Sequence, residues 1–309
     1  MSASTLISKQ VANFSQGALK AVLYLPGATA QGPTPGYIGC LESGAQSQSQ
    51  FDAESAARQR IAFLQAAKQR LFALGAQQVI GPIDGDTWHR YRLPLAGATG
   101  LTFLEPSYPT FTSGDFIAAG MPVIATYSTS VVTDLRLALE KLTEAETLDQ
   151  SHLLRVGVKI RCIRLRDFES ELERLYQFSI EAFKHNFLYT DIDPAAFKML
   201  YRPLVGLLRE ELVLLAQEDR ADGKLLGVVL VVPDQADRSA VIVKTLARHS
   251  AAPRGLGRYM FYEVLARAHQ LGYSKALCAL YKDNNFSAFL PEQIDGKVIR
   301  KFALFGCDQ

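Results

Sequence analysis

The stretch of residues 241–285 constrains the fold of this chain more than any other part of the sequence. Apolar residues fill positions 241–247 and predict a buried strand, and the turn that follows carries Gly255 and Gly257. A helix is expected next, because apolar residues recur at helical spacing until a glycine ends the pattern. Residues 275–281 form the following predicted strand. The glycine turn therefore joins a strand to the first turn of a helix.

A turn in this position is suited to bind phosphate. Glycines let backbone N–H groups approach a ligand closely, and the dipole of the helix favours negative charge at its N-terminus. Arg254 and Arg258 add positive charge beside the same turn. We therefore expect a pyrophosphate group to bind the backbone amides of residues 254–259.

Length and composition indicate a globular protein of more than one unit. A chain of 309 residues is long for a single hydrophobic core, so two units are expected. The content of 48% hydrophobic and 21% charged residues is that of an ordinary soluble protein. A formal net charge of +2 gives no indication of a nucleic acid or a membrane as partner, and we expect neither.

The cysteines and the N-terminus favour a reducing, cytoplasmic location. The four cysteines are far apart and have no histidine at ligand spacing, so neither a disulfide framework nor a metal site is expected. The first residues lack the basic head and apolar core of a signal peptide. The most apolar run, residues 225–232, is too short to span a bilayer.

The two halves of the chain contain similar successions of elements. The first half is expected to contain strands at 18–25 and 36–42, a long helix at 53–74, a strand at 77–83, a short helix at 111–119 and a strand at 123–128. A charged helical stretch at 133–148 is expected to connect the halves. The second half is expected to contain a strand at 158–165, helices at 168–185 and 194–210, strands at 212–217 and 225–232, the block described above and a closing strand at 297–305.

This order, together with the glycine turn, resembles the GNAT superfamily of acyl-CoA-dependent N-acetyltransferases. Members carry the pattern Gln/Arg-x-x-Gly-x-Gly/Ala in the turn, which falls on residues 252–257 here. Gly255 and Gly257 match the pattern, whereas Ala252 replaces the usual Gln or Arg.

A second pattern of the family, Asn-x-x-Ala-x-x-Leu-Tyr, falls further along the chain. Asn284 and Leu290 match it, and Ser287 is a small substitute for the alanine. Pro291 stands where many members carry the tyrosine that protonates the leaving thiolate. The usual general acid is therefore not expected at that position.

The resemblance implies an α/β (α+β) fold built of tandem GNAT-like units, each with a mixed, mostly antiparallel sheet flanked by helices. It implies a truncated, non-catalytic unit at residues 1–130, a helical connector at 131–157 and an acetyltransferase domain at 158–309. The turn between Glu42 and Ala53 has no Gly-x-Gly with a flanking arginine, so no cofactor is expected in the first unit.

The activity implied by the resemblance is direct transfer of an acetyl group from acetyl-CoA to an amine of a small molecule or peptide, without a metal. The backbone N–H of Leu246 would stabilise the oxyanion. The implied cofactor contacts are Leu246, Arg248, Arg254, Gly255, Leu256, Gly257, Arg258, Tyr259, Asn284 and Ser287.

The groups that move protons are less clearly indicated. Tyr281 ends the strand beside the expected thioester, where it either supplies the proton to the thiolate or packs as a half-buried strand tyrosine. Residues 239–250 contain no carboxylate, so the general base is unassigned. His249 is either that base or a histidine of the loop.

Two stretches are candidates for the acceptor site. Residues 183–193, between the two early helices, combine aromatic, His and Asp residues where family members usually bind the acceptor. Residues 84–92 either line a substrate pocket or pack the two halves together through Trp88 and Tyr91.

Two other functions remain compatible with the sequence. One is an acyl-CoA-binding protein with little or no catalysis, which would agree with Pro291. The other is a nucleotide-binding enzyme that uses the same turn. The second is less favoured, because the strand at 275–281 contains no acidic residue for a ribose.

Overall fold

The computed structural model describes residues 8–26, 34–43, 53–144, 150–220 and 223–309. Its first half contains β1 (Ser8–Gln16), β2 (Leu19–Pro26), β3 (Pro35–Ser43), α1 (Ala53–Ala73), β4 (Gln78–Gly81), β5 (Leu93–Pro94), α2 (Ser113–Ala118) and β6 (Val123–Val132). The expected elements are confirmed, and β1 and β5 are additions. β1 is an edge strand whose described side chains are mostly exposed, so it lacks the apolar pattern that predicts a strand.

The second half also follows the expected order. It contains α3 (Leu135–Glu144), α4 (Gln150–Arg155), β7 (Val158–Cys162), α5 (Phe168–Phe183), α6 (Pro194–Tyr201), β8 (Val213–Glu218), β9 (Leu225–Pro233), β10 (Ala240–Arg248), α7 (Leu256–Gln270), β11 (Lys275–Lys282), α8 (Phe289–Glu292) and β12 (Lys297–Asp308). The helix expected at 194–210 ends at Tyr201 and gives way to 3₁₀ turns, because Pro203 cannot continue an α-helix. Among the described residues, no helix has the length and apolar character needed to cross a membrane.

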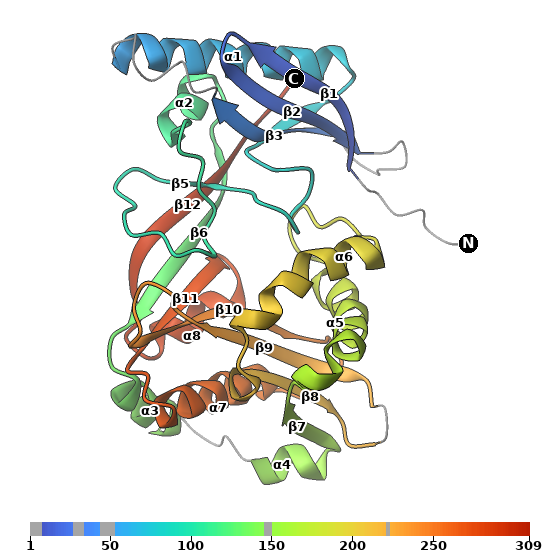
Figure 1. Cartoon of the computed structure of the whole chain (residues 1–309), viewed down its shortest axis with the longest axis vertical. Helices are drawn as coiled ribbons and strands as arrows, with labels where there is room; N and C mark the ends of the chain where they lie inside the picture. Colours follow the sequence, from blue (N-terminus) through green and yellow to red (C-terminus); the bar gives the residue numbers. More distant parts are fainter. Residues whose placement is uncertain (1–7, 27–33, 44–52, 145–149, 221–222) are drawn as a thin grey trace, which may run out of the picture.

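The described strands form one twelve-stranded sheet that runs through both halves (Figure 1). Its order is β1-β2-β3-β4-β12-β6-β11-β10-β9-β8-β7, and β5 pairs with β12. Parallel pairing occurs between β3 and β4 and between β10 and β11, and the other pairs are antiparallel. The mixed, mostly antiparallel sheet flanked by helices agrees with the predicted fold class.

The halves share strands at the centre of this sheet. β6 comes from the first half and lies between β11 and β12 of the second half. β12 comes from the second half and pairs with β4 of the first half. Figure 1 shows these two long strands running from the first half into the second half. The boundary expected at residue 130 falls inside β6, and the division into units remains a prediction.

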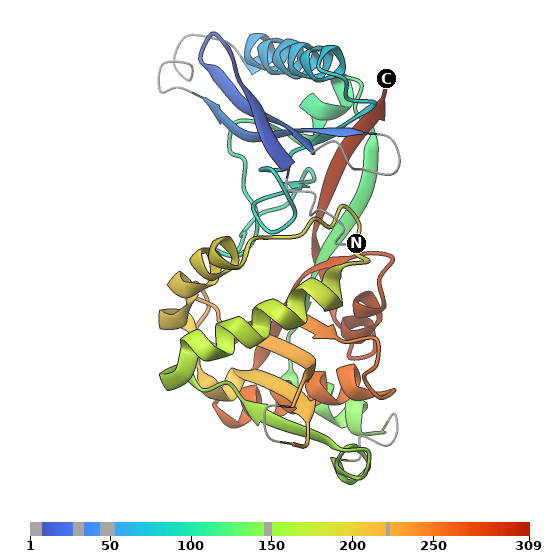
Figure 2. The ribbon, with the colours of Figure 1, turned by 90° about the vertical axis from the view of Figure 1, so that its right-hand side faces the viewer.

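Helices cover both faces of the second-half sheet. Alternate residues of β8 show the two sides: Leu214 and Ala216 pack in a cluster with α3 and α7, whereas Val213 and Leu215 pack with α5. In the first half α1 and α2 share one hydrophobic cluster with β2, β3 and β4. Figure 2 shows α5 and α6 in front of the sheet and the narrow waist between the halves. The α3 part of the expected connector thus belongs to the core of the second half.

Candidate functional site

β10 and β11 separate partway along their length. They pair in parallel only from Ala240 with Lys275 to Val243 with Cys278. Beyond that point the edge of β10 that faces β11 has no strand partner as far as Arg248, the end of β10. β11 continues there as a partner of β6. The backbone of β10 after Val243 therefore presents an open edge toward β11.

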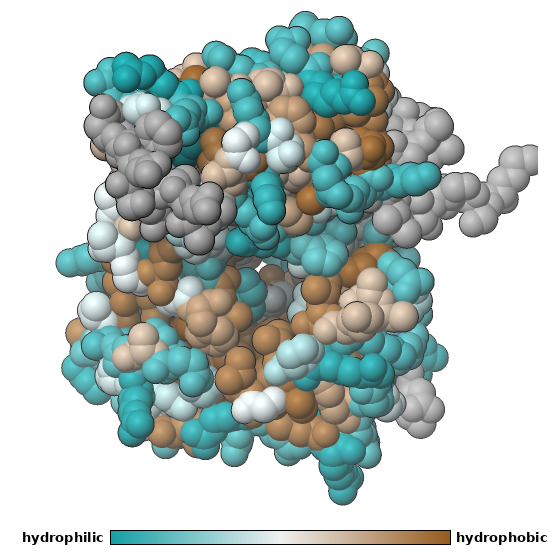
Figure 3. All heavy atoms as spheres, turned by 45° about the horizontal axis from the view of Figure 1, so that its top comes forward, coloured by the Kyte–Doolittle hydropathy of each residue, from teal (hydrophilic) through white to brown (hydrophobic). Residues whose placement is uncertain are grey.

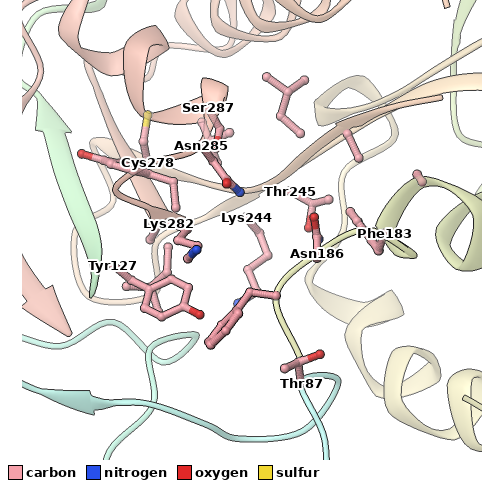
Figure 4. A pocket seen from close by; sticks show the side chains of 18 of the residues that line it. Thr87, Tyr127, Phe183, Asn186, Lys244, Thr245, Cys278, Lys282, Asn285 and Ser287 are labelled. Carbon is pink, nitrogen blue, oxygen red and sulfur yellow. The ribbon is translucent and has the colours of Figure 1, made fainter. Parts of the chain in front are cut away.

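A cavity of about 450 Å³ fills the space between the separated strands. Its wall also includes the segment after α5, the segment around α8 and a loop from the first half (Figure 4). The space-filling view shows a hollow at the waist of the molecule, bordered by hydrophobic side chains (Figure 3). The lining residues include Thr87, Trp88, Tyr91, Arg92, Tyr127, Phe183, Asn186, Phe187, Tyr189, Tyr201, Lys244, Thr245, Leu246, Arg248, Cys278, Tyr281, Lys282, Asn285, Ser287 and Pro291.

The N-terminus of α7 lies beside this opening. Gly255 precedes the helix with a φ of +87°, a conformation that favours glycine, and no side chain caps the helix. The amides of Gly257 and Arg258 donate to no backbone carbonyl of the described residues. A Cβ at Gly257 would lie 3.9 Å from Cδ of Arg248, which also lines the cavity. Arg248 thus connects the helix terminus with the cavity.

Positive charge gathers at the same terminus. Arg248 and Arg254 are exposed, and Arg258 is partly buried. Within the described part of the chain none of the three forms an ion pair, and Nε of Arg258 is buried without a hydrogen-bond partner. Free amides, a helix dipole and three arginines are together suited to bind an anion.

Tyr281 lies in the cavity wall, on β11 opposite β6. Its hydroxyl is hydrogen-bonded to Oγ of Ser130 on β6. Burial raises the pKa of Tyr281, and the hydrogen bond with Ser130 offsets part of this increase. The phenol therefore keeps its proton at neutral pH and is able to donate it.

The other expected cofactor contacts lie on both sides of the opening. Leu246 and Ser287 line the cavity, whereas Leu256 and Tyr259 are buried in the first turn of α7. Asn284 is exposed and is not part of the cavity wall; the neighbouring Asn285 is. The roles of all these residues remain predictions.

Pro291 also lies in the cavity wall, in α8. It is buried and has no proton to donate. The cavity therefore holds both the proline that replaces the usual tyrosine and a second tyrosine, Tyr281.

His249 proves to be a loop histidine. Its Nδ1 accepts a hydrogen bond from the amide of Ala251 at 3.1 Å, and its Nε2 lies 3.2 Å from Nζ of Lys224. It is not part of the cavity wall.

The four cysteines are free. Cys278 lines the cavity, but burial raises the pKa of its thiol to about 12, so it is not a nucleophile at neutral pH. The described residues contain no group of His, Cys, Asp and Glu side chains that could hold a metal ion.

The loop at 84–92 packs the two halves together and also lines the cavity. Trp88 makes edge-to-face contacts with Phe183, Tyr189 and Phe197 of the second half, and its indole N–H donates to the carbonyl of Thr190 at 2.8 Å. The same loop contributes Trp88 and Arg92 to the cavity wall. The first half therefore completes the cavity of the second.

A basic residue of the cavity wall, Lys244, was not among the predicted site residues. Lys244 is a single basic residue inside an apolar strand, and this isolated charge was a usable signal. Its side chain extends from β10 into the cavity toward the loop that carries Thr87 (Figure 4). Arg92 belongs to the stretch 84–92, for which lining a pocket was one of the two expectations, and the packing of the two halves brings it to the cavity wall.

The described part of the first half has no corresponding separation of strands. The β3–β4 ladder, which ends at Tyr37 with Ile80, is continued by a hydrogen bond from the amide of Ile83 to the carbonyl of Ile38. A Cβ at Gly39 would lie only 2.1 Å from the carbonyl oxygen of Ile83. The chain after β4 thus occupies the place that is open between β10 and β11. The turn at 44–52, where no phosphate site was expected, lies outside the described residues.

Comparison with known proteins relates the chain to others through structure alone. No family model matches the sequence, and no curated protein matches it. A GCN5-related N-acetyltransferase from Sphaerobacter thermophilus is similar with a TM-score of 0.53 and 11% identity, over 93% of this chain and 80% of that chain.

A second similar structure contains a GCN5-related glucosamine N-acetyltransferase region in a fungal multi-domain β-N-acetylglucosaminidase. The TM-score is 0.52 at 12% identity, over 94% of this chain. The present chain spans 31% of the length of that protein. The strand order, the separation of β10 from β11 and these similarities agree, and the chain has the fold of the GNAT superfamily of N-acetyltransferases.

Proposed function

We propose that this protein is an acyl-CoA-dependent N-acyltransferase, with acetyl-CoA as acyl donor and an amine as acceptor. The observation that carries the proposal is the cavity between the separated strands, which opens beside the uncapped N-terminus of α7. Such an arrangement suits a ligand with a pyrophosphate at one end and a reactive thioester at the other.

The pyrophosphate would bind the amides of residues 254–259. The amides of Gly257 and Arg258 have no backbone acceptor among the described residues, and Arg248 lies over Gly257. The pantetheine arm would then run past Arg248 along the open edge of β10, where it replaces the missing strand partner. The thioester would reach the part of the cavity lined by Leu246 and Tyr281.

The chemistry at this point is direct acyl transfer. The amine nitrogen attacks the thioester carbonyl, the C–N bond forms, the C–S bond breaks, and the amine proton is lost to a base or to water. A backbone N–H of β10 at Leu246 would stabilise the oxyanion. Tyr281 would give its proton to the leaving thiolate, since burial keeps the phenol protonated. Fixed placement of both substrates supplies the rest of the acceleration.

An acyl-CoA-binding protein without turnover is the second candidate. Pro291 in the cavity wall favours it, because a proline cannot act as the general acid. CoA binding without release of CoA from acetyl-CoA, tested over a broad amine panel, would identify this case.

The test of the cofactor site is Gly257→Glu. The position has an ordinary φ and room for a Cβ, so the fold tolerates the change. A carboxylate there would stand close to the phosphates, and like charges about 8 Å apart at an effective dielectric constant of about 20 repel by about 2 kcal/mol. Titration calorimetry with CoA should show a loss of affinity of at least about 30-fold.

Gly206→Glu is the matched control. Gly206 is exposed, has nothing within 4 Å of the position that a Cβ would take, and lies in the 3₁₀ turn Arg202–Leu207, away from α7. The substitution adds the same charge and should leave the affinity for CoA unchanged. Equal CoA affinity of the Gly257→Glu variant and the wild type would overturn the proposed cofactor site.

A further inference from the structure

Arg92 is a buried cation that forms no ion pair with any residue that the structure describes. Only 9% of the residue is exposed, and its Nε and Nη1 atoms are buried without a hydrogen-bond partner. Its guanidinium carbon lies 3.8 Å from the ring centre of Tyr91 and 4.1 Å from that of Tyr127. The two rings hold the guanidinium in place, but they leave the N–H groups of Nε and Nη1 unsatisfied, which is costly in a buried position.

The backbone of Arg92 adds to this cost. Its φ is +67°, in the left-handed region that non-glycine residues rarely adopt. Its amide donates to the carbonyl of Pro82 at 3.0 Å, which ties the loop to the end of β4. A strained residue with unsatisfied donors in a cavity wall is typical of a binding position.

Lys244 is a second cation in the same cavity. Its Nζ lies 3.3 Å from the carbonyl oxygen of Leu104, a long contact for an ammonium group. Burial, assisted by the charge of Arg92, lowers the pKa of Lys244 to about 8, and Glu105 acts in the opposite direction. The two cations are thus close enough to repel each other.

The carboxylate nearest to these cations is already engaged. Glu105 is buried and accepts hydrogen bonds from the amide of Thr102 at 2.8 Å and from Nε of Arg300 at 3.0 Å. Nη2 of Arg300 lies 2.9 Å from its other oxygen. Glu105 is therefore neutralised by Arg300 and leaves Arg92 and Lys244 uncompensated.

The rest of the cavity wall contains no acid to balance them. No Asp or Glu is among the lining residues that the structure describes, whereas Arg92, Lys244, Arg248 and Lys282 are. Arg248 belongs to the opening beside α7, and it is four residues from Lys244 along β10, which corresponds to about 13 Å of strand. Arg92 and Lys244 therefore form a separate positive site at the other end of the cavity, facing the first half.

We propose that Arg92 and Lys244 bind an anionic group of the acceptor, so that the acceptor is a small amine that also carries a carboxylate or a phosphate. The inference rests on the proposed acyl transfer. A planar guanidinium and a flexible ammonium suit the oxygens of either anion. Aromatic side chains on the α5 side and in the first-half loop surround the body of the acceptor, and the bound anion directs the amine toward β10.

The first experiment needs neither the acceptor nor CoA. Trp88, the one tryptophan of the sequence, lies in the cavity wall and reports on anions there. For each protein we compare the quenching of Trp88 fluorescence by iodide, an anion, with its quenching by acrylamide, which is neutral. The ratio of iodide quenching to acrylamide quenching should be at least about twofold higher in the wild type than in the Arg92→Gln and Lys244→Met variants. Arg70→Gln, on the exposed side of α1, is the charge-matched control and should behave as the wild type. Equal iodide quenching in the wild type and both cavity variants would overturn the proposal.

Acetate and inorganic phosphate distinguish the two kinds of anion. Each is added at fixed iodide, and the one that restores Trp88 fluorescence at lower concentration identifies the preferred group. Restoration by neither would contradict an anion site. Using two variants keeps the test valid if Arg92→Gln fails to fold, because Lys244→Met removes the other charge and keeps the length of the side chain.

Turnover completes the test. CoA release from acetyl-CoA is followed with amino acids against their amides, and with aminoalkyl phosphates against the amino alcohols. Within the preferred pair, the anionic amine should have a kcat/KM at least about tenfold higher than its neutral counterpart. The Arg92→Gln and Lys244→Met variants should both lose this preference, and their KM for acetyl-CoA should stay unchanged. A raised KM for acetyl-CoA with the preference intact would assign the cations to the acyl donor and overturn the proposal. Absence of CoA binding, with quenching as expected, would instead refute the proposed function alone.

Discussion

Tyr281 and Lys244 lie in one cavity, and burial favours the neutral form of both side chains. It raises the pKa of the Tyr281 phenol and lowers that of the Lys244 ammonium to about 8. For Tyr281 the result is a retained proton, as a proton donor requires. For Lys244 the result is a buried charge that destabilises the folded state unless a bound anion compensates it.

Tyr281→Phe tests the proton donor. General-acid help is typically worth about 10²–10⁴ in rate, and CoA remains a fair leaving group without it. We expect kcat to fall about tenfold or more, with CoA affinity nearly unchanged. Tyr273→Phe removes a hydroxyl that interacts with Arg209 outside the cavity and serves as control. Wild-type kcat in the Tyr281→Phe variant would leave this tyrosine with a packing role only.

Lys244→Met tests the cost of the buried charge. Between about pH 8 and the ordinary value of 10.5, the unfolded chain holds a proton that folded Lys244 has released. The contribution of this group to the free energy of unfolding therefore rises with pH in that window. We expect the variant to be more stable than the wild type at pH 7, by up to about 3 kcal/mol, and the difference to shrink by pH 10.

Urea denaturation at the two pH values measures this difference. Arg92 and Glu105 are the charged neighbours of Lys244. A difference between variant and wild type that is the same at pH 7 and pH 10 would show that Lys244 is not the titrating group.

At the scale of elements, each half contains a strand, a helix and a parallel strand, and only one of these units opens. β10 and β11 separate beyond Val243, and the cavity lies between them. β3 and β4 stay closed, because Gly39 allows the backbone of Ile83 to lie directly against the strand. The closed unit of the first half thus includes a close backbone contact at Gly39.

Gly39→Ala tests this contact. The added methyl group would stand 2.1 Å from the carbonyl oxygen of Ile83, so the backbone must shift. We expect a loss of about 2–3 kcal/mol in the free energy of unfolding. Gly257→Ala, whose Cβ has only an ordinary contact, is the matched control and should change stability by less than about 1 kcal/mol. Equal denaturation midpoints for the two variants would contradict the role of Gly39.

For the whole molecule, the exchange of β6 and β12 makes each half depend on the other. β6 supplies the strand between β11 and β12, and without it both strands would present unpaired edges. The cavity is likewise shared, since Trp88 and Arg92 of the first half complete its wall. The second half therefore needs at least β6 to fold, and the loop of the first half to form its complete cavity.

Two truncated chains test this dependence. Residues 121–309 keep β6, and we expect them to fold with a cooperative unfolding transition. Residues 133–309 lack β6, and we expect them to aggregate or to show little fixed structure by circular dichroism and size-exclusion chromatography. Cooperative unfolding of the shorter chain would show that β6 is dispensable.

Most elements of the second half and the place of the glycine turn follow from local patterns in the sequence. Apolar spacing at 241–247 and 256–271 specifies a strand and a helix locally, and Gly255 specifies the conformation between them. Lys244 was visible as a charge in an apolar strand, although its role was not recognised. These features can be predicted from the sequence because the spacing of apolar residues and the conformation of a turn depend on residues that are close along the chain.

The tertiary structure alone decided which strands meet and which residues face the cavity. The edge of a strand offers the same N–H and C=O groups to any partner, so nothing local marks β6 for β11 or β12 for β4. Arg92 reaches the cavity only through the packing of Trp88 against the second half. β1 was hidden for the same reason, because its pairing with β2 comes from backbone hydrogen bonds and not from an apolar pattern.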